Sequence, residues 1–99
     1  MWIETNKRKG PSDRELQTAA FIHSQQPVKQ RLRAPSTAEF PSFYFQIYRD
    51  GDTFTVRSHV DAQNSFGAKL RKQYICTLKY KGGDIASPQN WVVASVDIE

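Results

Sequence analysis

The chain has 99 residues, of which 38% are hydrophobic, 24% charged and 12% aromatic, and its formal net charge is +4. This length suits one domain with one core and is too short for two ordinary domains. No apolar run approaches the roughly 18 residues of a membrane span, and the polar, basic N-terminal residues lack the apolar stretch of a secretory signal. We therefore expect a cytoplasmic protein with no membrane partner, unless a leader has been removed.

Cysteine and histidine are too few for common metal and catalytic chemistry. Cys76 is the only cysteine, and His23 and His59 are the only histidines. They allow no internal disulfide and form no zinc site with sequence-local spacing. The sequence also lacks a nucleophile elbow and a phosphate-binding glycine loop. We predict no metal, no cofactor and no catalytic residues, and therefore a protein that is not an enzyme.

The N-terminal third is predicted to hold a basic arm and one helix. Residues 1–11 are polar and basic and are expected to form a flexible arm, so that a single domain spans residues 12–99. Ser12 and Glu15 match a capping box, which predicts a helix over residues 13–33. Because Pro27 removes one helical hydrogen bond, we expect a kink or a break near Gln25 and Gln26.

The chain between the helix and the sheet is predicted to make a short turn. Pro35 ends the helix, because the residue before a proline is pushed out of the helical conformation. A second S-x-x-E pattern, from Ser36 to Glu39, predicts one capped helical turn.

From residue 42 the hydrophobic pattern alternates with a period of about 2, which indicates strands. A first strand starts there and places Phe43, Phe45 and Ile47 on its buried face. An Asp-Gly-Asp turn at residues 50–52 leads to strands over 53–60, 69–80 and 91–98. The last strand is expected to bury Val92, Ala94, Val96 and Ile98, opposite Trp91. The predicted fold class is α+β: an N-terminal helix packed on a four-stranded antiparallel β-meander.

Two segments of this pattern match known motifs. Residues 28–41 read V-K-Q-R-L-R-A-P-S-T-A-E-F-P, and residues 60–71 read V-D-A-Q-N-S-F-G-A-K-L-R. Together they resemble a small domain of bacterial and phage-encoded proteins, often of unknown function, over residues 20–81. In that group the domain stands alone or is attached to zinc-ribbon, membrane or lipoprotein segments. The resemblance implies no catalytic residues, and Pro27 departs from the longer unbroken helix of the group.

One set of candidate site residues suits a protein partner. Exposed aromatic side chains can anchor an interface, and the polar residues 61–65 form the densest polar cluster. The candidate partner-binding residues are Tyr44, Tyr48, Trp91, Asp61 and Asn64. A structural role is the favoured interpretation of the cluster, with Asp61 and Asn64 bonding their own loop, Phe66 packed beneath it and Gly67 in a positive-φ conformation.

A second set suits nucleic acid. Residues 1–33 hold seven basic and three acidic side chains, and the rest of the chain sums to zero. The candidate nucleic-acid-binding residues are Lys7, Arg8, Lys9, Lys29, Arg31 and Arg33. No RNA-recognition or OB-fold motif accompanies them.

We predict Cys76 as a core residue and His59 as an exposed strand residue. The favoured function is a protein-binding module of a bacterium or phage, for example an inhibitor of a host defence complex, and the alternative is a nucleic-acid-binding protein.

Overall fold

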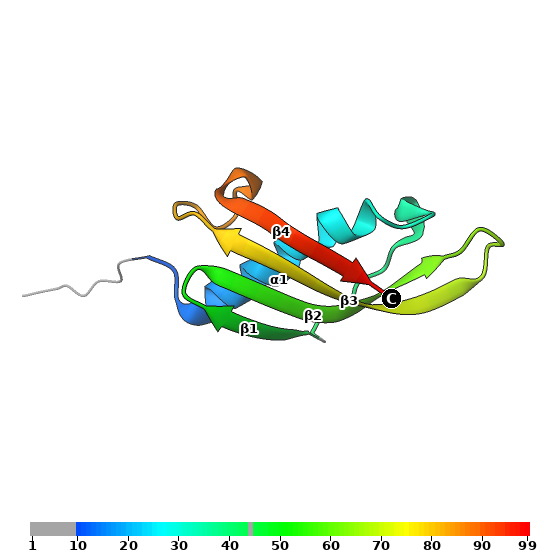
Figure 1. Ribbon diagram of the computed structural model, residues 1–99, viewed down its shortest axis with the longest axis horizontal. Helices are drawn as coiled ribbons and strands as arrows, with labels where there is room; N and C mark the ends of the chain where they lie inside the picture. Colours follow the sequence, from blue (N-terminus) through cyan, green and yellow to red (C-terminus); the bar gives the residue numbers. More distant parts are fainter. Residues whose placement is uncertain (1–9, 44) are drawn as a thin grey trace, which may run out of the picture.

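One helix covers one face of a four-stranded antiparallel sheet (Figure 1). The computed structural model describes residues 10–43 and 45–99. Helix α1 (Asp13–Lys29) is followed by strands β1 (Gln46–Asp50), β2 (Thr53–Gln63), β3 (Lys69–Tyr80) and β4 (Trp91–Ile98). The strands lie in the order β1-β2-β3-β4, so the predicted α+β meander is confirmed.

The start of α1 is fixed by local chemistry. Ser12 Oγ accepts a hydrogen bond from the Glu15 backbone N–H at 3.1 Å, and the Glu15 carboxylate accepts one from the Ser12 N–H at 2.8 Å. This is the predicted capping box, which satisfies two N–H groups that a helix start leaves without partners. The predicted end at residue 33 is wrong. The helix is not broken at Pro27, but ends two residues later at Lys29.

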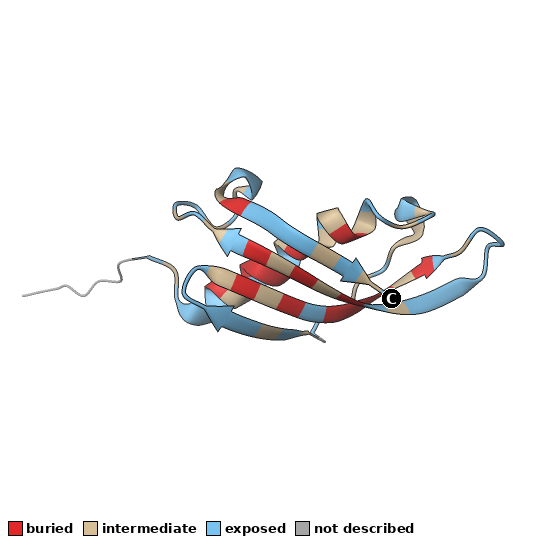
Figure 2. Ribbon diagram, in the orientation of Figure 1, coloured by how far each residue is buried: buried red, intermediate tan, exposed pale blue. Residues whose placement is uncertain are grey.

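The core lies between α1 and the inner face of the sheet (Figure 2). The helix buries Leu16, Ala20, Phe21 and Val28, which follow a helical spacing. The strands bury alternate residues: Phe54, Val56 and Val60 from β2, and Tyr74, Cys76 and Leu78 from β3. Cys76 is therefore a core residue as predicted. Burial raises the pKa of its thiol to about 11, so the thiol is protonated and unreactive near neutral pH.

Strand β4 does not keep the predicted alternation. Val96 pairs with Cys76, but Val93, three residues earlier, pairs with Leu78. The β-bulge between these pairs adds one residue to β4 and changes which face its first half presents. Trp91 is consequently buried, with 6% of its surface exposed, and Val92 is 47% exposed. Both side chains were predicted on the opposite faces.

Other departures come from packing outside the regular strands. Strand β1 begins at Gln46, and Phe43, which was predicted to be buried, is 90% exposed. The turn before it is a 3-10 helix over Pro35–Thr37 with no side-chain cap. Here Thr37 Oγ1 donates to the Ala34 carbonyl and accepts from the Gln63 N–H. Thr37 thereby ties this turn to the end of β2.

Candidate functional site

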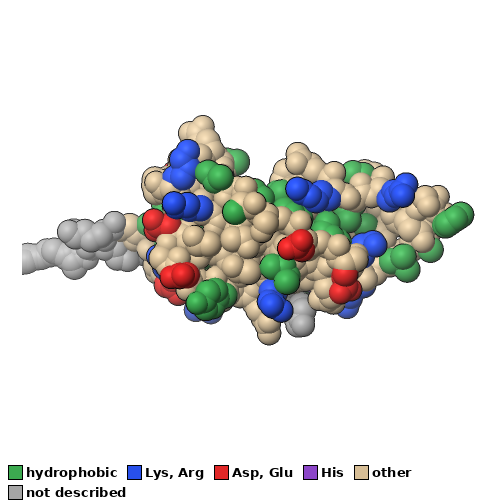
Figure 3. Space-filling view, in the orientation of Figure 1, with side chains coloured by type: hydrophobic (Ala, Val, Ile, Leu, Met, Phe, Trp, Pro, Cys, Tyr) green, Lys and Arg blue, Asp and Glu red, His purple; other side chains and the backbone are tan. Residues whose placement is uncertain are grey.

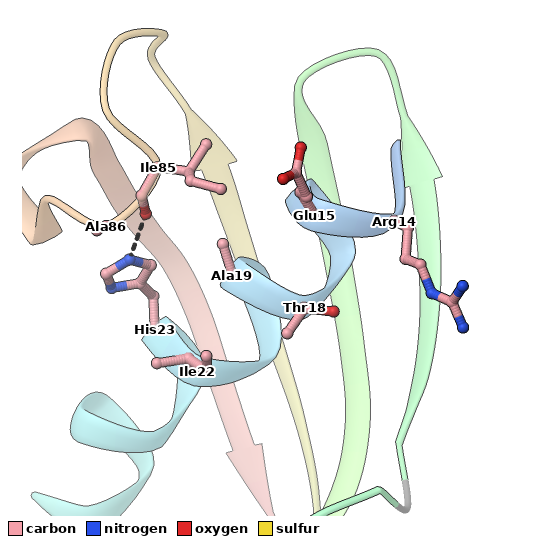
Figure 4. Close-up of a pocket in the computed structure, with 8 residues that line it drawn as sticks. All are labelled: Arg14, Glu15, Thr18, Ala19, Ile22, His23, Ile85 and Ala86. Carbon is pink, nitrogen blue, oxygen red and sulfur yellow. Dashed lines mark hydrogen bonds between the residues drawn. The ribbon is translucent and has the colours of Figure 1, made fainter. Parts of the chain in front are cut away.

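A groove opens between α1 and the loop that precedes β4 (Figure 4). Its volume is about 470 Å³, and apolar atoms form most of its surface. The lining residues are Arg14, Glu15, Thr18, Ala19, Ile22, His23, Ile85 and Ala86. Ile22 is 55% exposed at this groove, although it belongs to the helix that covers the sheet. An apolar side chain of a partner can therefore bury surface here without displacing any part of the fold.

Two hydrogen bonds to one carbonyl hold the wall of this groove. His23 Nε2 lies 2.7 Å from the Ile85 carbonyl oxygen, and Trp91 Nε1 donates to the same oxygen at 3.0 Å. A carbonyl oxygen only accepts, so the His23 proton in this contact is on Nε2. The rings of His23 and Trp91 also stack, with centroids 5.4 Å apart. The loop at Ile85 is thus fastened to α1 and β4, and the groove is pre-formed.

A second groove continues from the first, between α1 and β4. Its volume is about 380 Å³, and its lining residues are Ile22, His23, Gln26, Pro27, Leu78, Pro88, Trp91 and Val93. Ile22 and His23 line both grooves, so the two form one surface, which we call the α1–β4 surface. Val93 is 40% exposed at its edge. The surface runs beside β4 and is apolar over most of its area.

Strand β4 is the end strand of the sheet, and it pairs only with β3 among the described strands. Its other side offers backbone N–H and C=O groups to a partner chain. The opposite end strand, β1, is shorter and carries Arg49 and Asp50. Charges and short length are the usual protection of an edge strand, and β4 has neither over residues 91–96.

The predicted partner-binding residues do not form one site. Tyr48 is 69% exposed on the outer face of the sheet, as predicted, and Tyr44 lies outside the described residues. Trp91 is a core residue, so its prediction as an exposed anchor is wrong. The cause is the bulge in β4, which turns Trp91 toward Phe54 and Tyr80.

The predicted polar loop at residues 61–67 is partly strand. Strand β2 continues to Gln63, and Asp61 accepts two hydrogen bonds from Arg71 across the β2–β3 pair. The hydrogen bond from Arg71 lowers the pKa of the Asp61 carboxyl group. Asp61 therefore does not bond its own loop. Asn64 does: its Oδ1 accepts from the Phe66 and Ala68 N–H groups at 2.9 and 3.0 Å.

Of the two predictions for the residues beyond Asn64, one is confirmed and the other is wrong. Gly67 has a φ of +86°, a conformation that glycine adopts without strain, as predicted. Phe66 was expected beneath the loop but is 92% exposed. Hydrogen bonds hold this turn without packing from Phe66: besides the two bonds to Asn64 Oδ1, the Asn64 N–H donates to the Ala68 carbonyl and the Gly67 N–H donates to the Asn64 carbonyl.

The predicted nucleic-acid-binding residues do not form one exposed basic surface among the residues that the structure describes. Lys7, Arg8 and Lys9 lie outside the described residues, Lys29 is half-buried, and Arg31 and Arg33 are exposed after the end of α1. On the outer face of the sheet, acidic and basic side chains are interspersed (Figure 3). The described outer face therefore has no stripe of positive charge that would follow a phosphate backbone.

The part of the chain that the structure describes contains no cluster of side chains for a metal ion, and its second histidine is buried. His59, predicted to be exposed, is 8% exposed. No group of three or more His, Cys, Asp or Glu residues is placed to hold a metal ion within residues 10–43 and 45–99. No helix in these ranges is long and apolar enough to cross a membrane.

Neither a protein-family model, nor a curated protein, nor a solved structure matches the chain at a significant level. The resemblance of residues 20–81 to a small bacterial and phage domain therefore stays a prediction.

Proposed function

We propose that this protein is a non-catalytic protein-binding module that receives an extended segment of its partner along the free edge of β4. The observation that carries the proposal is the position of this edge beside the α1–β4 surface. An added strand would form backbone hydrogen bonds with β4, and every second side chain would point toward the grooves. Main-chain bonds supply affinity in this binding mode, and the side-chain grooves supply specificity.

The chemistry of the surface defines the partner segment. Ile22, Pro27 and Val93 offer apolar contacts, so apolar side chains at alternate positions of the segment suit them. The far end of β4 carries Asp97, so a basic residue at the matching end of the segment adds complementarity. Interspersed charge on the outer sheet face favours this function over nucleic-acid binding.

An accessory or inhibitory role in a bacterium or its phage, for example against a host defence complex, belongs to the same proposal. Its support is the resemblance of residues 20–81 alone. A small domain that blocks a complex by binding needs a complementary surface and no chemistry.

Peptide selection tests the proposal. A library of random twelve-residue peptides is selected on the immobilised full chain, and selected peptides are tested on folded variants. We expect alternating apolar sequences, new amide protection along β4, and loss of binding with Ile22→Lys or Val93→Lys. Tyr48→Lys places the same charge on the outer face and serves as the matched control. Peptides whose binding is lost with Tyr48→Lys but kept with Ile22→Lys would overturn the site.

The test also separates other occupants of the edge. If no peptide binds but the protein dimerises and Val93→Lys abolishes the dimer, the occupant is a second copy of the chain. A pull-down from bacterial lysate, with and without nuclease, separates a protein partner from nucleic acid. Capture that nuclease abolishes, and that Ile22→Lys leaves unchanged, contradicts a protein-binding module.

A further inference from the structure

A polar pocket lies at the end of the molecule away from the loop at Ile85. Its volume is about 320 Å³, and its lining residues are Arg31, Leu32, Arg33, Ala62, Gln63, Asn64, Ser65, Lys72, Ile98 and Glu99. We call it the arginine pocket. These residues come from the segment after α1, from the end of β2 and the turn that follows it, from β3 at Lys72, and from the end of β4 and the residue after it. It joins residues that sequence analysis had assigned to two different functions, Arg31 and Arg33 to one and Asn64 to the other.

The cations of this pocket have unused hydrogen-bond donors. The guanidinium groups of Arg31 and Arg33 form no hydrogen bond or ion pair with any residue that the structure describes. The Lys72 ammonium group makes one long contact, 3.4 Å, to the Glu99 backbone oxygen. Elsewhere, Arg49, Lys69 and Arg71 are each paired with a carboxylate. The pocket therefore gathers three cations whose donors remain available.

Asn64 adds a neutral donor with a fixed orientation. Its Oδ1 already accepts the Phe66 and Ala68 N–H groups, which determines how the amide is turned. The Nδ2 group of this pocket-lining side chain consequently remains free to donate. Ser65 contributes a hydroxyl group that can also donate. Opposed to these donors is one acidic side chain, Glu99, so the side chains sum to two positive charges.

The rest of the lining is apolar. Leu32 and Ile98 pack against the hydrophobic core and Ala62 is buried, so this wall is held in place by the fold. A ligand that fills the pocket therefore needs an anionic end and an apolar part. Two guanidinium groups suit the oxygens of a phosphate, because each presents a planar fork of N–H donors.

We propose that the arginine pocket binds a small organic phosphate, with the phosphate against Arg31, Arg33 and Lys72 and the organic part against Leu32, Ala62 and Ile98. This site is separate from the α1–β4 surface and does not depend on the function proposed for it. A phosphate on a free small molecule and a phosphate at the end of a nucleic-acid strand share this chemistry, and an oligonucleotide without a terminal phosphate separates both from binding of a nucleic-acid backbone.

Isothermal titration calorimetry with three probes tests the proposal on the full chain. Phenyl phosphate should bind saturably, and at least about tenfold more tightly than inorganic phosphate, because its ring covers the apolar wall. Phenol should show no saturable binding. The double variant Arg31→Ala with Arg33→Ala should weaken phenyl phosphate on the order of a hundredfold, since charge-assisted hydrogen bonds are lost. Both arginines are exposed, so the unfolding midpoint should stay unchanged.

The matched control removes the same charge elsewhere. Arg57→Ala with Lys79→Ala, from the outer face of the sheet, should change phenyl phosphate affinity by less than about threefold. Glu99→Gln should strengthen binding, because it removes the one acidic side chain of the pocket. Asn64→Asp keeps the acceptor of the loop hydrogen bonds but replaces the donor with a charge, and should weaken binding.

Three results would overturn the proposal. The first is no saturable binding of phenyl phosphate to the folded wild-type chain. The second is an equal loss in the Arg57/Lys79 control, which would mean that net charge alone attracts the anion. The third is tighter binding of an oligonucleotide without a terminal phosphate, with the same dependence on Arg31 and Arg33, which would make the pocket part of a nucleic-acid-binding surface.

Discussion

Replacement of Trp91 separates its role as a core residue from the role of partner anchor that the sequence suggested. The ring is 6% exposed and contacts three other rings: Tyr80 at 4.9 Å, His23 at 5.4 Å and Phe54 at 5.5 Å between centroids. Its Nε1 donates to the Ile85 carbonyl, which His23 Nε2 also contacts. Trp91→Ala therefore removes packing from α1, β2 and β3 at the same time.

The magnitude follows from the area that the ring buries. A buried tryptophan covers about 150–250 Å², and at about 25 cal/mol per Å² this corresponds to roughly 4–6 kcal/mol. Relaxation around the cavity lowers the cost, so we expect Trp91→Ala to reduce the free energy of unfolding by about 3–5 kcal/mol. The Ile85 carbonyl keeps its contact with His23, so no buried acceptor is left without a partner. Trp91→Phe should cost less, since a ring of similar kind refills most of the volume.

Urea unfolding followed by circular dichroism measures these changes. Tyr48→Ala is the matched control, because Tyr48 is 69% exposed on the outer face of the sheet and should change the free energy by at most about 0.5 kcal/mol. A loss below about 1 kcal/mol for Trp91→Ala would refute the buried assignment. It would also restore Trp91 as a candidate for the partner contact.

Two further predictions concern pH and the helix. Burial raises the pKa of the Tyr74 hydroxyl to about 12, so the unfolded chain releases this proton first as the pH rises from about 10 to 12. The folded chain then holds more protons, so stability should fall over this range by up to about 3 kcal/mol, and Tyr74→Phe should remove this part of the alkaline loss in urea unfolding. Pro27 lies in the last turn of α1 without an N–H to donate, so Pro27→Ala should raise the free energy of unfolding by about 1–2 kcal/mol. A lower unfolding midpoint for this variant would show that packing of the Pro27 ring stabilises the protein by more than the missing helical hydrogen bond destabilises it.

Local chemistry accounts for the features that the sequence predicted correctly. The capping box of Ser12 and Glu15, the turn at Gly51 and the positive φ of Gly67 each involve residues within four positions of one another. The change of hydrophobic period after residue 42 likewise predicts the sheet, because alternation is a property of each strand alone. These signals were enough to determine the α+β class, the bounds of β3 and β4, and the core position of Cys76.

Contacts between distant segments decided the rest. The bulge in β4 depends on its register with β3, and this register alone buried Trp91 and exposed Val92. Pairing with β3, which includes the salt bridge between Asp61 and Arg71, continues β2 to Gln63, where the polar residues had predicted a loop. Neither the α1–β4 surface nor the arginine pocket has a sequence signature, because each joins residues from parts of the chain far apart in the sequence. The sequence by itself determined which elements form, and tertiary packing determined which side chains those elements leave available to a partner.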